Sequence, residues 1–413
     1  MLTLISYVVS QMRKISERIK ELPLSPHRLL VAKVDELRRK GRTVYNYSAG
    51  QPGLPPDAEA LRIFNENVMK NPFDHFRYMG SQGLLKLREA ISEDLRKYGG
   101  IDISPDSIAI VSGGIDGIIL TLYAVTDPGD EVLLFDPCYS MYWGAVRFLK
   151  LKAETCKQSV DTGFQPDPEC IKESVSDKTA AIFFASPDNP TSRIISEEVA
   201  KTIADIASEK KIWIIYDVAY KHIIYEGQHI WLEKYVSDPD ILINIASFSK
   251  DIAIPGGRLG YVYGPKEVIQ QIVKLKGYLS ITAPVPMQWL AYYYLSSGLK
   301  EKYLKYALDV YRKRRDAAYE AFRKYLPEAK IWKPPASMYL FPDMSPYLER
   351  LGMNDIDFTF KLAEAKAVVM LPGSIFGDAG KNHLRVTFVT QPEDKLEKGI
   401  QLLAEFIEEL EKK

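Results

Sequence analysis

The sequence has few of the residues that build disulfide frameworks or metal sites. Its 413 residues include three cysteines, Cys138, Cys156 and Cys170, which are widely spaced and odd in number. This usage is typical of a reducing cytosol and predicts no disulfide framework. The five histidines show no ligand spacing such as HExxH, so we expect no metal site.

Long apolar runs and an excess of charge of one sign are also missing. The formal net charge is zero and the charges are mixed along the chain, which argues against nucleic acid or a membrane surface as a partner. The apolar stretch LTLISYVV near the N-terminus is too short for a membrane span, and no basic segment precedes it as in a signal peptide. We therefore expect a soluble, cytoplasmic protein of enzyme size.

Helical segments and apolar strands alternate from about Asp57 onwards. The predicted strands are SIAIVSG, EVLLFDP, AAIFFASP, IWIIYD, ILINIAS and GYVYG. This alternation favours an α/β fold with a mainly parallel sheet flanked by helices. After Tyr261 the alternation fades, and a long amphipathic helix is expected over about 299–325, followed by mixed strands and helices.

These changes along the chain predict two domains and an extension. We expect an N-terminal helical extension over 1–24, a large domain over 53–298, and a smaller α/β domain formed by 25–52 together with 299–413. The segment SPHRLLVAKVDELRRKG at the start of the small domain has a serine cap, a proline at the first helical position and a final glycine, which indicates a helix.

A lysine follows the most apolar of these strands, in ILINIASFSKDIAIPGGRLGY. Lys250 at the mouth of a buried strand is partly desolvated, which favours its neutral, nucleophilic form. Ser247 and Arg258 have the hydroxyl and the guanidinium to hold one anionic group beside it. Pyridoxal phosphate needs such a pair, because its aldehyde forms a Schiff base and its phosphate is the anchor. The alternative is a solvated loop lysine.

The S-F-S-K followed by P-G-G-R-L-G-Y resembles the cofactor-lysine signature of the class I/II aminotransferases, which are fold-type-I pyridoxal-phosphate enzymes. The resemblance covers nearly the whole chain from about Ser25. It implies that Lys250 is catalytic and that Ser247, Ser249 and Arg258 help to bind pyridoxal 5'-phosphate.

Two further strand ends match the family's cofactor site. Gly113 and Gly114 end a strand and open a helix, where N–H groups can hold a phosphate, although a plain turn explains them equally well. The resemblance assigns the phosphate to the N–H groups of Gly114 and Ile115. It also implies that Tyr139, in DPCY, stacks on the pyridine ring; the alternative is a core aromatic.

The motif ASPDNPTS supplies Asn189, which in the family bonds the phenolic oxygen of the cofactor and touches the substrate. This sequence departs from the usual pattern, since Ser192 stands where glycine is common and Ser186 and Asp188 replace asparagines. The resemblance also suggests cis peptide bonds before Pro137 and Pro190.

Asp217 closes the strand IWIIYD, and Tyr220 follows one turn later. A buried carboxylate needs a cation, and the protonated pyridine nitrogen of the cofactor would supply one. The alternative is a helix N-cap. The resemblance implies that Tyr220 bonds the phenolic oxygen of the cofactor.

Substrate and partner contacts come from the resemblance alone. It implies that Arg385 binds the substrate α-carboxylate, for which a guanidinium is well suited, and that Gly50 lets the backbone approach that carboxylate. Tyr78 would reach the phosphate of the partner subunit, which implies a homodimer with shared active sites. Arg28 resembles an arginine of aminoadipate- and kynurenine-type members that meets the distal carboxylate; the alternative is a surface arginine.

These motifs together predict a transaminase that moves the α-amino group of an L-amino acid to a 2-oxo acid, with 2-oxoglutarate as acceptor. A pyridoxal-phosphate C–S lyase or a cyclopropane-forming synthase on the same fold is the alternative, because these reactions begin from the same carbanion. A regulatory module that binds the cofactor without turnover is the third interpretation.

Overall fold

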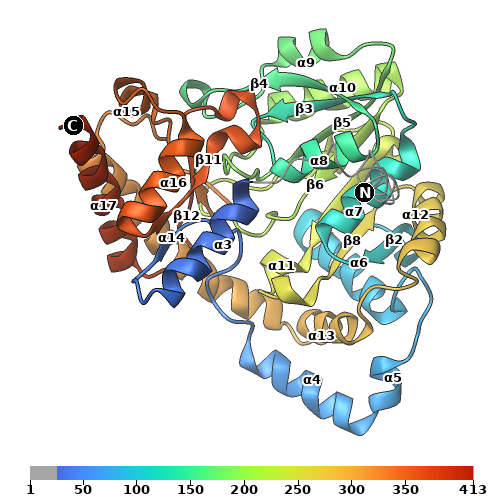
Figure 1. Cartoon of the computed structure of the whole chain (residues 1–413). Helices are drawn as coiled ribbons and strands as arrows, with labels where there is room; N and C mark the ends of the chain where they lie inside the picture. The colour runs from blue at the N-terminus through green and yellow to red at the C-terminus, as the bar shows by residue number, and fades with distance from the viewer. Residues whose placement is uncertain (1–25, 413) are drawn as a thin grey trace, which may run out of the picture.

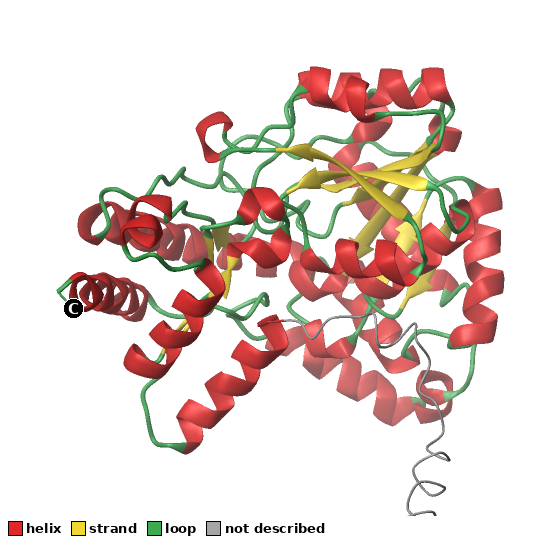
Figure 2. Ribbon diagram, turned by 45° about the horizontal axis from the view of Figure 1, so that its top comes forward, coloured by secondary structure: helices red, strands yellow, loops and turns green. Residues whose placement is uncertain are grey.

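A seven-stranded sheet forms the centre of the molecule (Figures 1 and 2). The computed structural model describes residues 26–412. The strand order is β2-β8-β7-β6-β5-β3-β4, in which β8 is antiparallel to both neighbours and the other pairs are parallel. The predicted α/β fold is therefore confirmed. The strands are β2 (Ile108–Val111), β3 (Glu131–Asp136), β4 (Lys152–Lys157), β5 (Thr179–Ala185), β6 (Trp213–Asp217), β7 (Leu242–Ser247) and β8 (Gly260–Tyr263).

Alternate residues of the strands face two separate cores. In β5, Ile182 and Phe184 belong to one core, and Ala181 and Phe183 belong to the other. Burial on both faces explains why these strands are continuous apolar runs in the sequence. The first core includes α6 (Leu85–Gly99), α10 (Glu197–Lys210) and α13 (Val285–Ser296), and the second includes α7 (Gly114–Val125), α8 (Ser140–Phe148) and α12 (Lys266–Leu279).

The parallel strands all end at one edge of the sheet. Asp217, the last residue of β6, pairs in register with Ala185 of β5 and Ile245 of β7. The segments that follow these strands therefore lie side by side, and they carry most of the residues predicted to bind the cofactor.

The smaller part of the molecule joins the beginning of the described chain to its end. The short strand β1 (Tyr45–Asn46) pairs with β10 (Val368–Val369), and a three-stranded antiparallel sheet has the order β11-β12-β9. Its strands are β9 (Tyr339–Leu340), β11 (Leu371–Pro372) and β12 (Leu384–Thr387), and its helices are α3 (Pro26–Arg39), α14 (Leu299–Tyr325), α15 (Ser345–Arg350), α16 (Asp355–Lys366) and α17 (Glu393–Glu411). The long helix predicted over 299–325 is confirmed as α14. We propose that the domain boundaries lie at 52/53 and 298/299.

The other helices are α4 (Ala58–Lys70) and α5 (Pro72–Phe76) at the lower edge of Figure 1, α9 (Pro168–Ser174) beside β4, and α11 (Phe248–Asp251) after β7. The predicted N-terminal extension, 1–24, and the capping Ser25 lie outside the described residues. Within 26–412, none of the helices combines the length and the apolar character that a membrane span requires.

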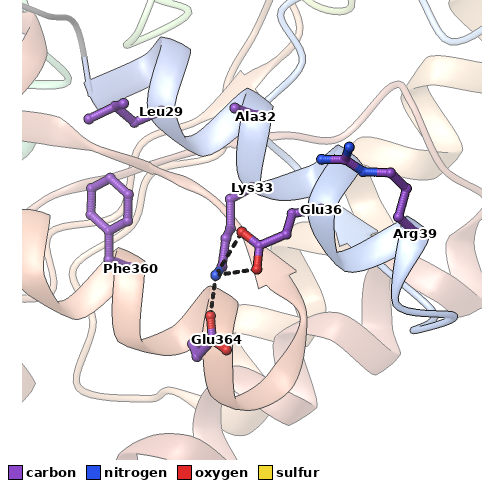
Figure 3. A pocket seen from close by; sticks show the side chains of 7 residues that line it. All are labelled: Leu29, Ala32, Lys33, Glu36, Arg39, Phe360 and Glu364. Carbon is purple, nitrogen blue, oxygen red and sulfur yellow. Dashed lines mark hydrogen bonds and ion pairs between the residues drawn. The ribbon is translucent and has the colours of Figure 1, made fainter.

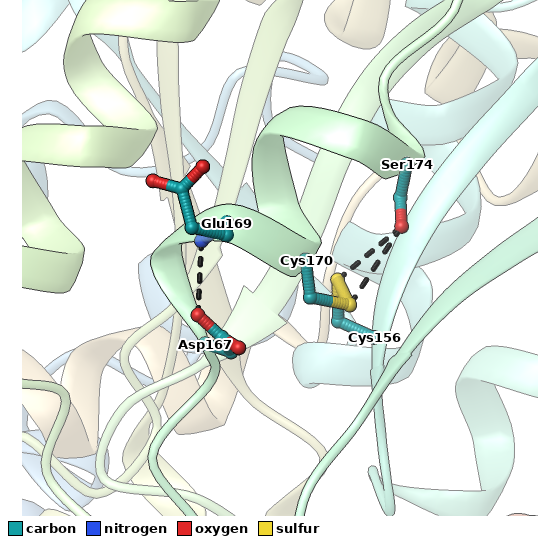
Figure 4. The surroundings of a disulfide bond; sticks show 5 residues. All are labelled: Cys156, Asp167, Glu169, Cys170 and Ser174. Carbon is teal, nitrogen blue, oxygen red and sulfur yellow. Dashed lines mark hydrogen bonds between the residues drawn. A yellow bond between two sulfur atoms is a disulfide. The ribbon is translucent and has the colours of Figure 1, made fainter.

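Two expectations about the β4 region are wrong. The strand β4 was not predicted, because its sequence KAETCK is mostly polar and half-exposed. The expectation of no disulfide is contradicted by a bond between Cys156 of β4 and Cys170 of α9 (Figure 4). The chain turns back between the two residues, so that their Cα atoms are 5.8 Å apart, a distance typical of a disulfide. Cys138 is free and buried.

Candidate active site

A corner rich in hydrogen-bond donors lies where α7 begins. Gly113 has a φ of +90°, and a Cβ atom there would lie 2.5 Å from Nη2 of Arg258. A Cβ atom on Gly114 would lie 3.8 Å from the Cβ of Ser247. The N–H groups of the first helical turn, including that of Ile115, have no partner within the helix. These donors and the guanidinium make the corner suitable for an anion such as a phosphate.

The turn from β7 into α11 is fixed by a serine cap. The Oγ of Ser247 accepts a hydrogen bond from the N–H of Ser249 at 3.2 Å, and both side chains are buried. This cap sets the direction of the four-residue helix α11, in which Lys250 is the third residue.

Lys250 lies between the two parts of the molecule. Its Nζ donates a hydrogen bond to the carbonyl oxygen of Gly50 at 2.5 Å and lies 5.5 Å from the centre of the Tyr220 ring. Burial lowers the pKa of Lys250 to about 7, and the nearby charge of Arg385 adds to this effect. The side chain is therefore often neutral near pH 7, which is the form that attacks a carbonyl carbon.

Asp217 is a buried carboxylate, and within 26–412 it has no bonded cation. Its Oδ1 accepts a hydrogen bond from the N–H of Ala219 at 3.0 Å, and its Oδ2 accepts one from the hydroxyl of Tyr142 at 2.8 Å. Burial raises the pKa of Asp217 to about 6. Tyr142, in the first turn of α8, was not identified from the sequence, although a buried tyrosine usually has a hydrogen-bond partner.

Four tyrosine side chains lie near these groups, in two contacting pairs. Tyr139 packs edge-on against Tyr142, with their ring centres 5.6 Å apart. The hydroxyl groups of Tyr220 and Tyr339 are 2.7 Å apart, and both side chains are buried. Tyr339 comes from β9 in the smaller part of the molecule and was not predicted, because nothing in MYLF marks one aromatic above its neighbours.

Arg385 of β12 is buried and points at residues from three segments. Its Nη1 donates to Oδ1 of Asn189 at 3.2 Å, and its Nη2 donates to the carbonyl oxygen of Ser48 at 2.6 Å. Its guanidinium lies 4.5 Å from the centre of the Tyr339 ring. A Cβ atom on Gly50 would lie 3.5 Å from both terminal nitrogens. Arg385, Asn189 and Gly50 therefore lie together, and their predicted contacts with the substrate stay a prediction.

The loop after β5 places Asn189 beside Arg385. The predicted cis peptide bonds before Pro137 and Pro190 are confirmed, and a third precedes Pro187. Ser192, where the sequence departs from the family pattern, adopts the left-handed conformation with a φ of +61°.

Two predicted residues lie away from this cluster. Tyr78 follows α5 and its side chain is 81% exposed. Arg28 is exposed in the first turn of α3, and among residues 26–412 no hydrogen bond or ion pair joins it to Arg385, Asn189 or Gly50. The structure of the single chain therefore brings neither side chain to the strand-end site.

A surface groove lies between α3 and α16 (Figure 3). Its lining does not include Lys250, Asp217 or Arg385. Lys33 pairs with Glu36 on its own helix and with Glu364 of α16 across the groove. Beneath this contact the buried Leu30 and Val34 pack α3 onto the smaller part of the molecule. The groove thus shows how α3 is attached; its lining residues are Leu29, Ala32, Lys33, Glu36, Arg39, Phe360 and Glu364.

A lysine with a lowered pKa, a buried carboxylate and an anion-binding corner at one sheet edge fit an enzyme that binds a phosphorylated aldehyde through its lysine. The sequence profile of the family "Aminotransferase class I and II" matches residues 43–403. The chain belongs to this family.

Individual relatives agree with this assignment. A probable aspartate/prephenate aminotransferase of Aquifex aeolicus is 32% identical over 97% of this chain and 100% of its own length. An aspartate aminotransferase of Pyrococcus horikoshii is 33% identical over 78% of this chain and 80% of its own length. The crystallised aspartate aminotransferase of Thermus thermophilus with maleate superposes with a TM-score of 0.88 at 27% identity, over 95% of this chain and 100% of that one. The protein is thus a transaminase of fold type I.

Aminotransferases of this kind use pyridoxal 5'-phosphate, and the residues present fit that group. The corner at Gly113, Gly114 and Arg258 offers the donors that a phosphate needs, and a side chain at Gly113 would collide with the guanidinium of Arg258. Asp217 is a buried carboxylate that matches a protonated ring nitrogen, and the lowered pKa of Lys250 makes a neutral amine available to an aldehyde.

Proposed function

We propose that the protein transfers the α-amino group of an L-amino acid to 2-oxoglutarate, using Lys250 as the residue that binds the cofactor and moves the proton. The convergence of Lys250, Asp217 and Arg385 at one sheet edge is the observation that supports this proposal. When bound, pyridoxal phosphate withdraws electrons from the substrate α-carbon and carries the amino group between the two substrates.

The side chains have separate roles in this proposal. Arg385 holds the substrate α-carboxylate through paired hydrogen bonds, with Asn189 and the backbone at Gly50 beside it. This contact directs the α-hydrogen toward Nζ of Lys250, which takes the proton and returns it at a different atom. Asp217 stays ionised and keeps the ring nitrogen protonated. Ser247, Ser249, Arg258 and the N–H groups of Gly114 and Ile115 hold the phosphate, Tyr139 covers the ring, and Tyr220 bonds its phenolic oxygen.

The side chain of the amino donor needs its own pocket beside the α-carboxylate site. The residues from Leu259 to Tyr311 include no arginine, so a distal carboxylate held by a partner arginine from this stretch is not expected. An apolar or aromatic side-chain pocket and a pocket closed by Arg28 are the two solutions we infer. The relatives are named for aspartate and prephenate and not for aminoadipate or kynurenine. The role of Arg28 that the aminoadipate- and kynurenine-type members suggest therefore stays a prediction.

We also propose that two copies of the chain form a homodimer with shared active sites. Tyr78 lies in the segment after α5, and Nζ of Lys276 in α12 donates to the carbonyl oxygen of Ser81 in the same segment at 2.7 Å. Large apolar side chains on α4, α5 and the end of α12 are exposed around this connection, and a second copy would cover them. They are Met69, Phe73, Phe76, Tyr278 and Leu279.

A transamination assay tests the proposal. Purified protein with cofactor is given 2-oxoglutarate and, in turn, aspartate, glutamate, 2-aminoadipate, phenylalanine, tyrosine and alanine. We expect glutamate from at least one donor other than glutamate itself, with Lys250→Ala as the inactive control. In a parallel reaction with cysteine or cystathionine, which carry sulfur on Cβ as a leaving group, pyruvate and ammonia formed without an acceptor would indicate a lyase instead, which the relatives do not favour.

A further inference from the structure

Ser192 is held in a backbone conformation that serine rarely adopts. Its φ is +61° and its side chain is fully buried. The left-handed region is comfortable for glycine and disfavoured for residues with a Cβ atom. A buried serine at this place therefore needs a compensating interaction.

The hydroxyl of Ser192 supplies that interaction by binding one residue twice. Its Oγ donates to the carbonyl oxygen of Tyr339 at 2.9 Å and accepts from the N–H of Tyr339 at 3.2 Å. Tyr339 lies in β9, the outer strand of its sheet, and its backbone groups would otherwise be unpaired there. The loop that carries Asn189 is thus bonded to the strand that carries Tyr339.

The side chain of Tyr339 contacts Tyr220, which is predicted to bind the cofactor, and Arg385, which is predicted to bind the substrate. Its hydroxyl lies 2.7 Å from that of Tyr220, with the two rings nearly perpendicular at 79°. The guanidinium of Arg385 lies over its ring at 4.5 Å. A Cβ atom on Gly50 would lie 3.0 Å from its hydroxyl oxygen. Tyr339 fills the space among these three residues.

The geometry also favours one direction for the hydrogen bond between the tyrosines. The cation lies over the ring of Tyr339, which draws electron density from that ring and makes its hydroxyl the better donor. If Tyr339 donates, the oxygen of Tyr220 accepts, and the single proton of Tyr220 is left for another acceptor.

We propose that Ser192 and Tyr339 are positioning residues that fix the hydroxyl of Tyr220 and direct its proton toward the phenolic oxygen of the cofactor. This inference rests on the proposed function, because Tyr220 must face the cofactor. Ser192 fixes the backbone of Tyr339, and Tyr339 donates to Tyr220. A hydrogen-bond chain of this kind strengthens the final donor.

Ser192→Gly separates this role from a merely structural one. Glycine relieves the strained conformation but removes both hydrogen bonds and leaves the backbone groups of Tyr339 unpaired, so these two effects on the melting temperature oppose each other, and a merely structural role predicts an unchanged pH midpoint. We expect the pH midpoint of the visible absorbance of the lysine-bound cofactor to move upward. The shift has this sign because a weaker donor leaves the phenolic oxygen better able to retain the shared proton.

Tyr339→Phe should move the same pH midpoint upward by roughly half a unit to one unit, since it removes the donor itself. The value of kcat should fall by about 3- to 30-fold. Tyr220→Phe should shift the midpoint further, and adding Tyr339→Phe to it should add almost nothing, because Tyr339 acts through Tyr220. Tyr347→Phe is the matched control, since its buried hydroxyl accepts the N–H of Glu328 at 3.1 Å, and it should leave the midpoint unchanged.

The outcomes distinguish the two levels of the proposal. A wild-type protein that takes up no pyridoxal phosphate and shows no visible band overturns the proposed function. A wild-type protein that titrates normally, with Ser192→Gly and Tyr339→Phe titrating at the same pH, overturns the positioning role alone. Additive shifts in the double variant also overturn it, because they would mean that Tyr339 acts without Tyr220.

Discussion

The Nζ of Lys221 lies 3.3 Å from Oδ2 of Asp251, and both side chains are almost completely buried. Lys221 follows Tyr220 directly, and Asp251 follows Lys250 directly. The ion pair therefore connects the segment after β6, which carries Tyr220, with the helix α11, which carries Lys250.

Removing one partner of this pair should destabilise the protein strongly. Lys221→Met removes the nearest cation from the buried Asp251 carboxylate, whose remaining partner His222, 4.0 Å from Oδ2, is charged only when protonated. The loss costs about 3–5 kcal/mol in the free energy of unfolding. Urea unfolding measures this loss. Lys266→Met is the control, because its pair with Asp106 at 3.0 Å is exposed on both sides and contributes about 0–1 kcal/mol. Equal losses in the two variants would contradict a buried, uncompensated charge.

The reactivity of Lys250 should follow its lowered pKa. The neutral amine appears as the pH rises through about 7, whereas an ordinary lysine becomes neutral only above pH 10. We expect the rate at which the cofactor-free protein binds pyridoxal phosphate to reach half its maximum near pH 7. Arg385→Leu removes a positive charge that contributes to the lowered pKa, so its half-maximum should move to higher pH. A wild-type rate that still rises at pH 10 would refute the assignment.

Asp217→Asn should make the cofactor-free protein more stable while slowing catalysis. Burial raises the pKa of Asp217 to about 6 in the folded state, above its value in the unfolded chain, so the folded state holds a proton that the unfolded state has lost. Stability from this group is present below about pH 4 and is lost as the pH rises through 6. The asparagine variant keeps it, with a gain of about 3 kcal/mol at pH 7.

Thermal unfolding of both cofactor-free proteins between pH 4 and 8 checks this result. The two curves should meet at the acid end and separate toward neutral pH. With cofactor present, the variant should lose mainly kcat, because a neutral amide does not stabilise a protonated ring nitrogen. A variant altered only in cofactor affinity would make Asp217 an anchor.

Tyr78 predicts active sites that are shared between two chains. Tyr78→Phe and Lys250→Ala proteins, each weakly active or inactive alone, are mixed under conditions that exchange subunits. Half of the sites in a mixed dimer then contain both native residues, so activity should return. Phe76→Ala serves as the control for the surface itself, since it alters the same exposed region without touching the predicted phosphate contact. No gain on mixing would remove the argument for shared sites.

Arg28 predicts a difference between classes of substrate. If it closes over the site, Arg28→Ala raises KM for glutamate and 2-oxoglutarate by roughly 10- to 100-fold and leaves KM for neutral amino acids nearly unchanged. Arg38→Ala, on the same helix and also exposed, is the control and should change neither. Equal effects on both substrate classes would leave Arg28 as a surface arginine.

The strands and helices that could be predicted are those in which burial alone determines the order of apolar and polar residues. The strands ending at Asp217 and Ser247 are buried on both faces, so they are apolar throughout and easily recognised. In the helix over 299–325 the amphipathic pattern repeats over many turns, so it is easily recognised. The strand β4 lies at the edge of the sheet with polar, half-exposed residues, so no such pattern marks it.

Residues of the site were predictable where a motif carries them and not where only the tertiary fold does. Lys250, Asp217 and Asn189 stand beside strand ends, next to diagnostic neighbours. Tyr142 and Tyr339 are two of 25 tyrosines, and only packing shows that their hydroxyls meet Asp217 and Tyr220. The bond between Cys156 and Cys170 likewise depends on how the chain turns between them, which spacing alone does not reveal.

The pairing of β1 with β10 limits the order in which the chain can fold during synthesis. Tyr45 and Asn46 leave the ribosome early, but their partners Val368 and Val369 are translated near the end. The seven-stranded sheet is complete once Tyr263 has emerged, so Lys250 and Asp217 can take their places first. Arg385 arrives only with the last residues. A nascent chain can therefore bring Lys250 and Asp217 together before Arg385 is translated, whereas β1 stays without its pairing strand until β10 has been made.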